Sequence, residues 1–207
     1  MAAYPQLYGG SVYVGSPYFS SRNNTGPEAF VLHVMDGTLA GCDSWFSSAQ
    51  NYGQVSAHFG MNKLGELHQY IYLTNGAHAN GAIENWNLKL IKENNYSNPN
   101  TWTVSLEMEG KGPFNDCWPE QFEAAAQLCA WVFKEVLFKS GATGVAIDRD
   151  HILQHSDISP TSRPNCAGWT EARMQLFIQR VKAISTGALV DPRVKQARDL
   201  LSQTLGN

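Results

Sequence analysis

The sequence predicts a single α/β domain, and two observations support this prediction. The chain has 207 residues, of which 43% are hydrophobic and 11% aromatic, so it is long enough and apolar enough to bury a core of its own. Short segments with the composition of β-strands also alternate along it with segments of helical periodicity. The same composition excludes the collagen-like, low-complexity and disordered classes.

Five segments carry the strand signals. Residues 29–35 (AFVLHVM) are rich in β-branched and aromatic residues and stand between the turn-like sequences GPE and DGT. Residues 55–61 and 66–72 flank an NKLG turn and predict a β-hairpin. Residues 101–109 (TWTVSLEME) alternate between apolar and polar side chains, and residues 151–155 (HILQH) form a further short apolar segment.

Helical spacing is clearest over residues 119–139, where Pro119 suits the first turn. Its apolar face is predicted to hold Phe122, Ala125, Ala126, Cys129, Val132, Phe133, Val136 and Leu137. Thr170 is expected to cap another helix. That helix would turn inward Met174, Phe177, Ile178 and Val181. Asp43 or Ser44 is expected to cap a short helix that carries Trp45, Phe46, Ala49 and Tyr52, and the Asn-rich loop over residues 74–100 is expected to hold a short helix near 83–91.

These signals divide the chain into three parts. Residues 1–28 are rich in Gly, Pro, Ser, Asn and Tyr and predict an irregular N-terminal arm with short extended pieces. Residues 29–186 contain the main strand and helix signals and form the predicted domain. Residues 187–207 predict a short helical tail with apolar side chains at Val194, Ala197, Leu201 and Leu205.

Charge and hydropathy limit the possible partners and locations. The formal net charge is −3, so the charge balance gives no reason to expect a nucleic-acid partner, which would need a basic face. No apolar run approaches the roughly 20 residues that span a bilayer, so no membrane insertion is expected. The first residues (MAAYPQLYGGSVYVGS) lack the basic and apolar regions of a signal peptide, so synthesis in the cytoplasm without a leader is expected. The four cysteines form no CxxC pair, and their disulfide state cannot be read from the sequence.

Three residues point to a metal site. His33 lies in an otherwise apolar strand, His155 ends another apolar segment, and Cys166 follows eleven residues later across a loop with two prolines. Imidazole and thiolate are ligand types that zinc prefers, and three protein ligands would leave a fourth position for water, as in catalytic zinc sites. The alternative is a core histidine, a surface histidine and a small buried cysteine.

A second chemical signal lies in VSLEMEG. Alternation places Ser105, Glu107 and Glu109 on one face of the strand and apolar residues on the other. A carboxylate on the inner face of a sheet is costly unless it has a partner or a task, and Glu107 would suit a general base beside a metal-bound water. The alternative is that this face is solvated.

Five segments together resemble a known family. In order they are VLHVMDG, VSAHFGMNKLGELHQYI, GAHANG, TVSLEMEG and ILQHSDISPTSRPNCAGW. Over about residues 28–184 this order resembles the type 2 N-acetylmuramoyl-L-alanine amidases, zinc enzymes of phage endolysins and bacterial wall recycling that are related to the peptidoglycan recognition proteins. The resemblance implies a central mixed β-sheet flanked by helices, with Zn²⁺ held by His33, His155 and Cys166.

The resemblance also implies roles for residues around the metal. Glu107 matches the catalytic carboxylate, while Ala57 stands where some members have a catalytic tyrosine. Pro164 stands where many members have a lysine, so the adjacent Arg163 is expected to supply the positive charge that stabilises the oxyanion. His78 matches a histidine near the cleft and is expected to orient a ligand or line the substrate groove.

The resemblance implies hydrolysis of the amide between N-acetylmuramic acid and L-alanine of peptidoglycan. A monomer is expected, although the sequence does not determine the oligomeric state. Without a signal peptide, the expected context is a phage lysin made in the host cytoplasm, and the competing context is a cytosolic enzyme of muropeptide recycling. Three other readings remain open: a module that binds peptidoglycan without cutting it, a hydrolase with Cys166 as nucleophile, and a protein in which zinc is structural.

Overall fold

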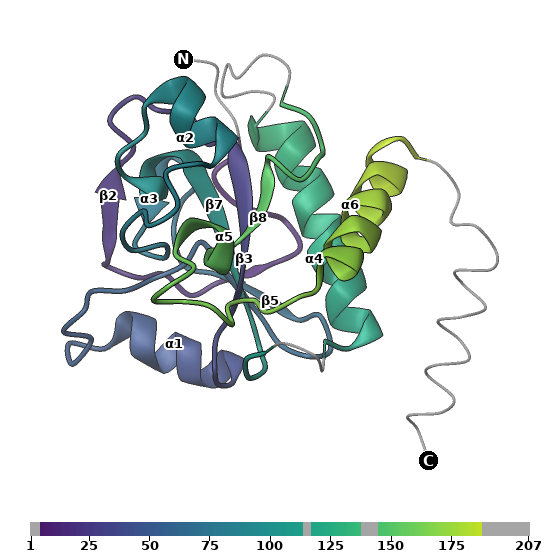
Figure 1. The fold of residues 1–207 in the computed structure, drawn as a ribbon. Coiled ribbons are helices and arrows are strands. Elements are labelled where there is room, and N and C mark those ends of the chain that lie inside the picture. The colour runs from purple at the N-terminus through teal and green to yellow at the C-terminus, as the bar shows by residue number, and fades with distance from the viewer. Residues whose placement is uncertain (1–4, 114–116, 138–144, 188–207) are drawn as a thin grey trace.

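In the computed structural model, the described residues (5–113, 117–137 and 145–187) form two sheets and the helices that pack on them (Figure 1). The strands are β1 (Val12–Tyr13), β2 (Phe19–Ser21), β3 (Ala29–Val34), β4 (Phe59–Met61), β5 (Leu67–Gln69), β6 (Asn75–Ala77), β7 (Thr103–Met108) and β8 (Ile152–Gln154). The helices are α1 (Leu39–Ser47), α2 (Lys89–Asn94), α3 (Pro99–Trp102), α4 (Pro119–Trp131), the π-helical η1 (Val132–Leu137), α5 (His155–Ile158) and α6 (Glu171–Ser185).

The main sheet is mixed, as expected. Its six strands lie in the order β1-β5-β4-β7-β3-β8, and β2 and β6 form a separate antiparallel pair. Strands β4, β7, β3 and β8 are parallel, whereas β4 and β5 are antiparallel and form the predicted hairpin. In this register His33 of β3 lies opposite Glu107 of β7.

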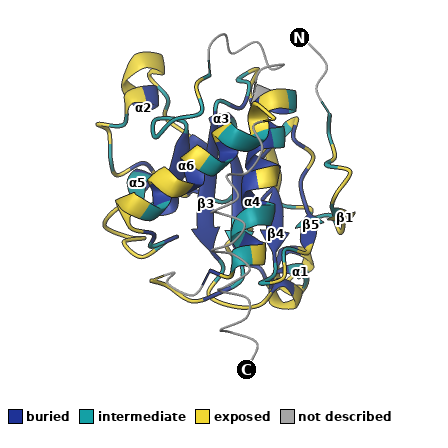
Figure 2. Cartoon of the chain, turned by 90° about the vertical axis from the view of Figure 1, so that its right-hand side faces the viewer, coloured by how far each residue is buried: buried dark blue, intermediate teal, exposed yellow. Residues whose placement is uncertain are grey.

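Side-chain alternation gives the sheet two different faces. Leu32 and Leu106 point to the face covered by α4 and α6, where they join the largest apolar cluster with Leu128 and Phe177. Figure 2 looks from the side of these two helices and shows the buried strands behind them. The alternate positions, which include His33, point to the other face, where α1, α2 and α5 pack and the candidate site lies.

Two helix predictions are confirmed by the structure. Helix α4 begins at Pro119 and continues as η1 to Leu137, while residues 138–139 of the predicted helix lie outside the described residues. Helix α6 begins directly after Thr170, whose side chain accepts a hydrogen bond from the Arg173 amide.

The predicted cap of the first helix is wrong. Helix α1 begins four residues earlier than Asp43, with Thr38 as its cap, and Ala49 and Tyr52 lie beyond its end. Asp43 instead accepts hydrogen bonds from the Tyr70 hydroxyl at 2.7 Å and from His68 at 2.9 Å. An aspartate with two tertiary partners is not available to cap a helix, which local sequence could not reveal.

Other boundaries are displaced by a few residues. The helix expected near 83–91 is α2, at Lys89–Asn94. The strand expected over 101–109 begins at Thr103, because Pro99 starts the short helix α3 just before it. The segment 151–155 contains a three-residue strand, and His155 already belongs to α5.

The N-terminal arm contributes one short strand to each of the two sheets. The short extended pieces expected in the arm are β1, which pairs with β5, and β2, which pairs with β6. The predicted tail falls almost wholly on residues 188–207, which lie outside the described residues. None of the helices in the described ranges combines the length and apolar character needed to cross a bilayer.

Candidate metal centre

Neighbouring strand ends bring the two predicted histidine ligands together. His33 is the last but one residue of β3, and His155 follows directly after β8. Strands β3 and β8 are parallel neighbours, and Leu32 lies opposite Gln154. The residues that follow these two, His33 and His155, therefore lie together at the same edge of the sheet. The two imidazole rings lie 4.5 Å apart, centre to centre.

Hydrogen bonds from the Gln154 side chain and from the loop backbone hold Cys166 beside the two histidines. The Gln154 side chain accepts from the Trp169 amide at 2.8 Å and donates to the Trp169 carbonyl at 3.1 Å, which holds the end of the cysteine loop against β8. The Ser156 amide donates to the Cys166 carbonyl at 2.6 Å. The Val34 amide lies 3.4 Å from Cys166 Sγ, beside the end of β3.

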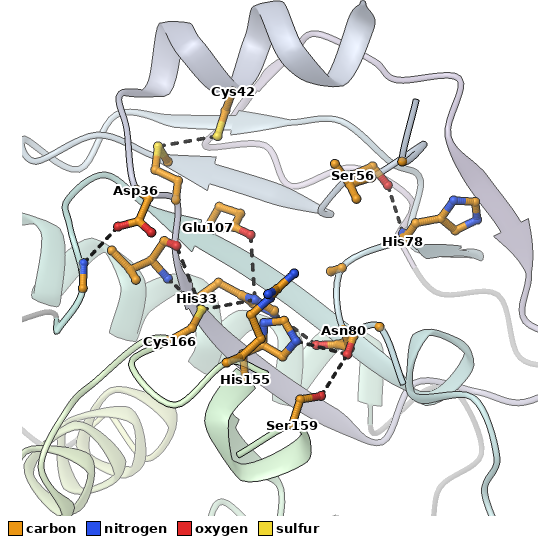
Figure 3. A pocket seen from close by; sticks show the side chains of 18 of the residues that line it. His33, Asp36, Cys42, Ser56, His78, Asn80, Glu107, His155, Ser159 and Cys166 are labelled. Carbon is orange, nitrogen blue, oxygen red and sulfur yellow. Dashed lines mark hydrogen bonds and ion pairs between the residues drawn. The ribbon is translucent and has the colours of Figure 1, made fainter. Parts of the chain in front are cut away.

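The three predicted ligands therefore converge. One ligand atom from each of His33, His155 and Cys166 lies within 4.8 Å of the others, and His33 Nδ1 lies 3.8 Å from Cys166 Sγ. Figure 3 shows the three side chains pointing toward one another. Both histidines are buried and the cysteine is partly buried. The alternative of a core histidine, a surface histidine and an unrelated cysteine does not fit, because both histidines are buried and all three side chains lie together.

The donor set suits a cation. Each histidine turns Nε2 toward Asn80 and leaves Nδ1 for a ligand. Burial lowers the pKa of both histidines, that of His155 to about 4, so both rings are neutral at pH 7, as a metal ligand must be. Burial also raises the pKa of the Cys166 thiol to about 12, so binding a metal there would release its proton.

Glu107 lies beside this cluster with an unsatisfied oxygen. Its Oε1 is 3.7 Å from His33 Nδ1, and its Oε2 is buried with no hydrogen-bond partner among the described residues. Burial, together with the nearby charge of Asp36, raises the pKa of Glu107 to about 8, and the charge of Arg163 opposes this. Ser105 on the same face is wholly buried, so the face is not simply solvated.

A cleft of about 900 Å³ opens over the cluster. One wall comes from α1 and the loop after it, including the half-exposed Trp45. The other wall is the loop with Arg163 and Pro164. Glu84, from a distant part of the chain, accepts hydrogen bonds from the loop amides of residues 161 and 162. Among the described residues that line the cleft, Arg163 is the only lysine or arginine, and its charge acts on the pKa of Glu107, Cys166 and both histidines.

His78 lines the cleft but does not point at the cluster. Its Nε2 lies 2.7 Å from Ser20 Oγ and its Nδ1 lies 2.9 Å from the Gln54 carbonyl oxygen. Figure 3 shows its ring turned away from His33. No tyrosine is found among the described residues that line the cleft, and Ala57 is buried, which agrees with a carboxylate in place of a catalytic tyrosine.

Sequence reasoning missed two residues of the site. Asp36, just after β3, accepts a hydrogen bond from the Gly112 amide, and its charge helps to raise the pKa of Glu107. Asn80, which is fully buried, contacts both histidines. Both stand in segments that carry the family resemblance, VLHVMDG and GAHANG, but nothing local distinguishes them from ordinary turn residues.

Comparisons with solved structures identify the fold. A selenomethionine derivative of AmpD superposes with a TM-score of 0.61 at 19% identity, over 86% of this chain and 99% of that chain. A mutant of PlyL gives 0.57 at 14% identity, over 84% and 98%. The Staphylococcus aureus hydrolase AmiA in complex with its ligand gives 0.53 at 13% identity, over 91% and 98%. At these identities the likeness shows the fold alone, and it confirms the mixed sheet flanked by helices.

Sequence comparisons identify the family. Comparison with curated protein sequences gave no match. A family model described as N-acetylmuramoyl-L-alanine amidase matches residues 23–169, a range that contains the three clustered side chains, Glu107 and Arg163. Since this match covers more than half of the chain, the protein belongs to the N-acetylmuramoyl-L-alanine amidase family.

Proposed function

We propose that this chain is a zinc-dependent amidase that cleaves the amide between N-acetylmuramic acid and L-alanine of peptidoglycan. Zinc would be held by His33, His155 and Cys166. The observation that supports this most is the buried Glu107 Oε2, which has no partner in the described part of the chain and lies beside those three side chains. An unsatisfied buried carboxylate oxygen is costly, so it indicates a group kept for water or substrate.

Each side chain then has a distinct task. Zinc, when bound, supplies a Lewis acid that polarises the amide carbonyl and lowers the pKa of water. Glu107 takes a proton from the attacking water and returns it to the leaving amine of alanine. A pKa near neutrality suits a group that must both accept and donate a proton at neutral pH. The burial that raises the pKa of Glu107 therefore serves the reaction.

Arg163 is proposed to stabilise the oxyanion of the tetrahedral intermediate. It is the one lysine or arginine among the described residues that line the cleft, and Glu84 holds its loop through two amides. Pro164, at the position where many family members carry a lysine, has no charge to offer. A guanidinium positions two donors in one plane, so it substitutes for the lysine charge with a different geometry.

Hydrolysis of purified cell walls tests the proposal. We expect the full chain to release new alanine amino groups, to lose this activity in a chelator and to regain it with Zn²⁺. Glu107→Gln keeps the ligands, so it should bind zinc while releasing amine at least about 100-fold more slowly than wild type. Wall binding without release of amine, with or without zinc, would support a recognition module instead.

The same assay separates the remaining readings. A hydrolase with Cys166 as nucleophile would be inactivated by alkylation but would ignore the chelator. A structural zinc would stabilise the fold without any wall hydrolysis. Either result would contradict the proposal.

We further propose that the chain is a phage lysin that acts on intact walls as a monomer. The alternative is a cytosolic enzyme that takes soluble muropeptides. Parallel assays on intact sacculi and on soluble anhydro-muropeptides distinguish them. Activity on the soluble substrate alone would overturn the lysin assignment while leaving the amidase chemistry intact.

A further inference from the structure

One buried asparagine lies behind both proposed histidine ligands. Asn80 follows β6 and is fully buried. Its side-chain Oδ1 is 3.1 Å from His33 Nε2, and its main-chain oxygen is 3.1 Å from His155 Nε2. A single residue therefore contacts each ring on the side away from the cluster, once through its side chain and once through its backbone (Figure 3).

A chain of hydrogen bonds fixes which end of the Asn80 amide faces His33. The Thr103 hydroxyl donates its only hydrogen to the Pro99 carbonyl at 2.8 Å. Toward Asn80 Nδ2, also at 2.8 Å, the same hydroxyl must therefore accept. This places the amide nitrogen of Asn80 on Thr103 and leaves the amide oxygen facing His33.

The orientation of the amide determines the histidine tautomers. A carbonyl oxygen only accepts, so Nε2 of His33 and Nε2 of His155 must each carry the hydrogen. A neutral imidazole has one ring hydrogen, so Nδ1 of both rings keeps its lone pair. His33 Nδ1 is the atom that lies 3.8 Å from Cys166 Sγ, within the cluster.

We propose that Asn80 is a positioning residue of the metal centre, which holds His33 in the tautomer and ring orientation that bind zinc. The inference rests on the ligand set given under the proposed function. Thr103 acts through Asn80 by fixing the amide orientation. His155 contacts the backbone oxygen of Asn80 and not its side chain. A substitution of Asn80 should therefore affect the tautomer of His33 and leave that of His155 unchanged.

Zinc affinity of the full chain is the first measurement. Competition with a chromophoric chelator gives the Kd of wild type and of Asn80→Ala. Loss of the hydrogen bond behind a metal ligand typically costs 10- to 100-fold in affinity, and we expect a loss of about that size. Asn80→Asp keeps an oxygen acceptor toward His33 and should recover most of the affinity lost in the alanine variant.

Nitrogen NMR of the histidine rings in ¹⁵N-labelled, zinc-free protein is the second measurement. In wild type both His33 and His155 should show the hydrogen on Nε2. In Asn80→Ala the His33 signals should shift toward a mixture of tautomers, while the His155 signals stay as in wild type. A general loosening of the fold would move both rings together.

Two further variants keep the test decisive. Gln69→Ala removes another fully buried amide, which binds the N-terminal arm far from the cluster, and should lower the melting temperature without changing the zinc Kd. Thr103→Val touches neither histidine but releases the Asn80 amide, so it should weaken zinc binding by a smaller factor. This variant also serves if Asn80→Ala does not fold.

The outcomes separate this inference from the proposed function. A wild-type chain that binds no zinc would overturn the ligand set and this inference with it. A wild-type chain that binds zinc, together with an Asn80→Ala or Thr103→Val variant that binds within twofold of it, would overturn the inference alone. Equal losses of affinity in Gln69→Ala and Asn80→Ala would do the same, because they would reflect stability only.

Discussion

At the scale of single residues, burial decides the chemistry of this site. Burial disfavours the ionised form of Glu107, and the charge of Asp36 adds to this effect, so the pKa of Glu107 rises to about 8. His33 and His155 are buried by the same surroundings, which keep their rings neutral. The same burial thus favours the protonated form of Glu107 and the neutral form of both histidines, which suits the metal-dependent hydrolysis that we propose.

Glu107→Gln is expected to remove activity and to stabilise the zinc-free protein at alkaline pH. The folded-state pKa of Glu107 lies above its ordinary value of 4.5, so its favourable contribution is complete below about pH 4.5 and is lost as the pH rises through 8. That loss amounts to at most about 5 kcal/mol for a shift of this size, and glutamine does not suffer it. Loss of a general base should lower kcat by about 10²- to 10⁴-fold.

Urea unfolding of both proteins in chelator at pH 5 and pH 9 measures the stability effect, and amine release from cell walls measures kcat. The same decrease in stability between the two pH values in wild type and variant would refute the assigned cause. Retention of kcat would remove Glu107 from the mechanism.

Arg163→Ala is expected to lower kcat with little change in KM, because the proposed contact forms mainly in the transition state. Arg163 is exposed, and solvent weakens its charge, so the loss of kcat should fall below the roughly 100- to 1000-fold of a buried oxyanion donor, at about 10- to 100-fold. Steady-state kinetics on a soluble muropeptide measure both constants. An unchanged kcat would show that the positive charge of Arg163 does not contribute to catalysis.

At the scale of elements, parallel strands and one loop assemble the site. β3 and β8 end side by side and present His33 and His155, while β7 places Glu107 next to His33 in register. The loop with Cys166 carries no strand or helix of its own before α6, so its position depends on contacts with β8 and α5. Among these, the two hydrogen bonds between Gln154 and the Trp169 backbone join the far end of the loop to the sheet.

Gln154→Ala should therefore weaken zinc binding as well as stability. It leaves the buried amide and carbonyl of Trp169 without their partner, which should cost about 1–3 kcal/mol of unfolding free energy. Thr170→Ala, which removes the cap of the neighbouring helix α6, should cost about 1 kcal/mol and leave zinc affinity unchanged. Denaturant unfolding and zinc titration of the two variants test this pair, and an equal zinc Kd in both would contradict the role of Gln154.

At the scale of the whole molecule, the two faces of the sheet have separate tasks. One face packs against α4 and α6 in the largest apolar cluster, while the other holds the polar site beneath α1 and the loops. Polar groups such as His33 and Glu107 are costly to bury. The continuous apolar packing behind the sheet compensates for this cost and lets the other face hold them.

Deletion of residues 188–207 is expected to leave catalysis and zinc binding unchanged. All the proposed site residues lie between His33 and Cys166, and the described part of α6 already completes the packing against α4. Wall hydrolysis and zinc titration of the shortened chain test the predicted domain limit at residue 186. A loss of more than about tenfold in either would assign residues 188–207 a role in the site.

The sequence by itself determined the parts of this protein that depend on local patterns. Period-two alternation in TVSLEM placed Glu107 opposite the apolar face, and helical spacing after Pro119 gave α4. The order of five segments gave the family and pointed to the three side chains that the structure clusters, which we propose as ligands. Tertiary structure decided the rest. The His78 ring contacts Ser20 and Gln54 and does not point at the cluster. Asp43 accepts a hydrogen bond from Tyr70 and does not cap a helix. Asn80 contacts both His33 and His155. These contacts join residues far apart in the chain, and the direction of a buried amide or ring follows from which donors and acceptors surround it, for which no local pattern exists.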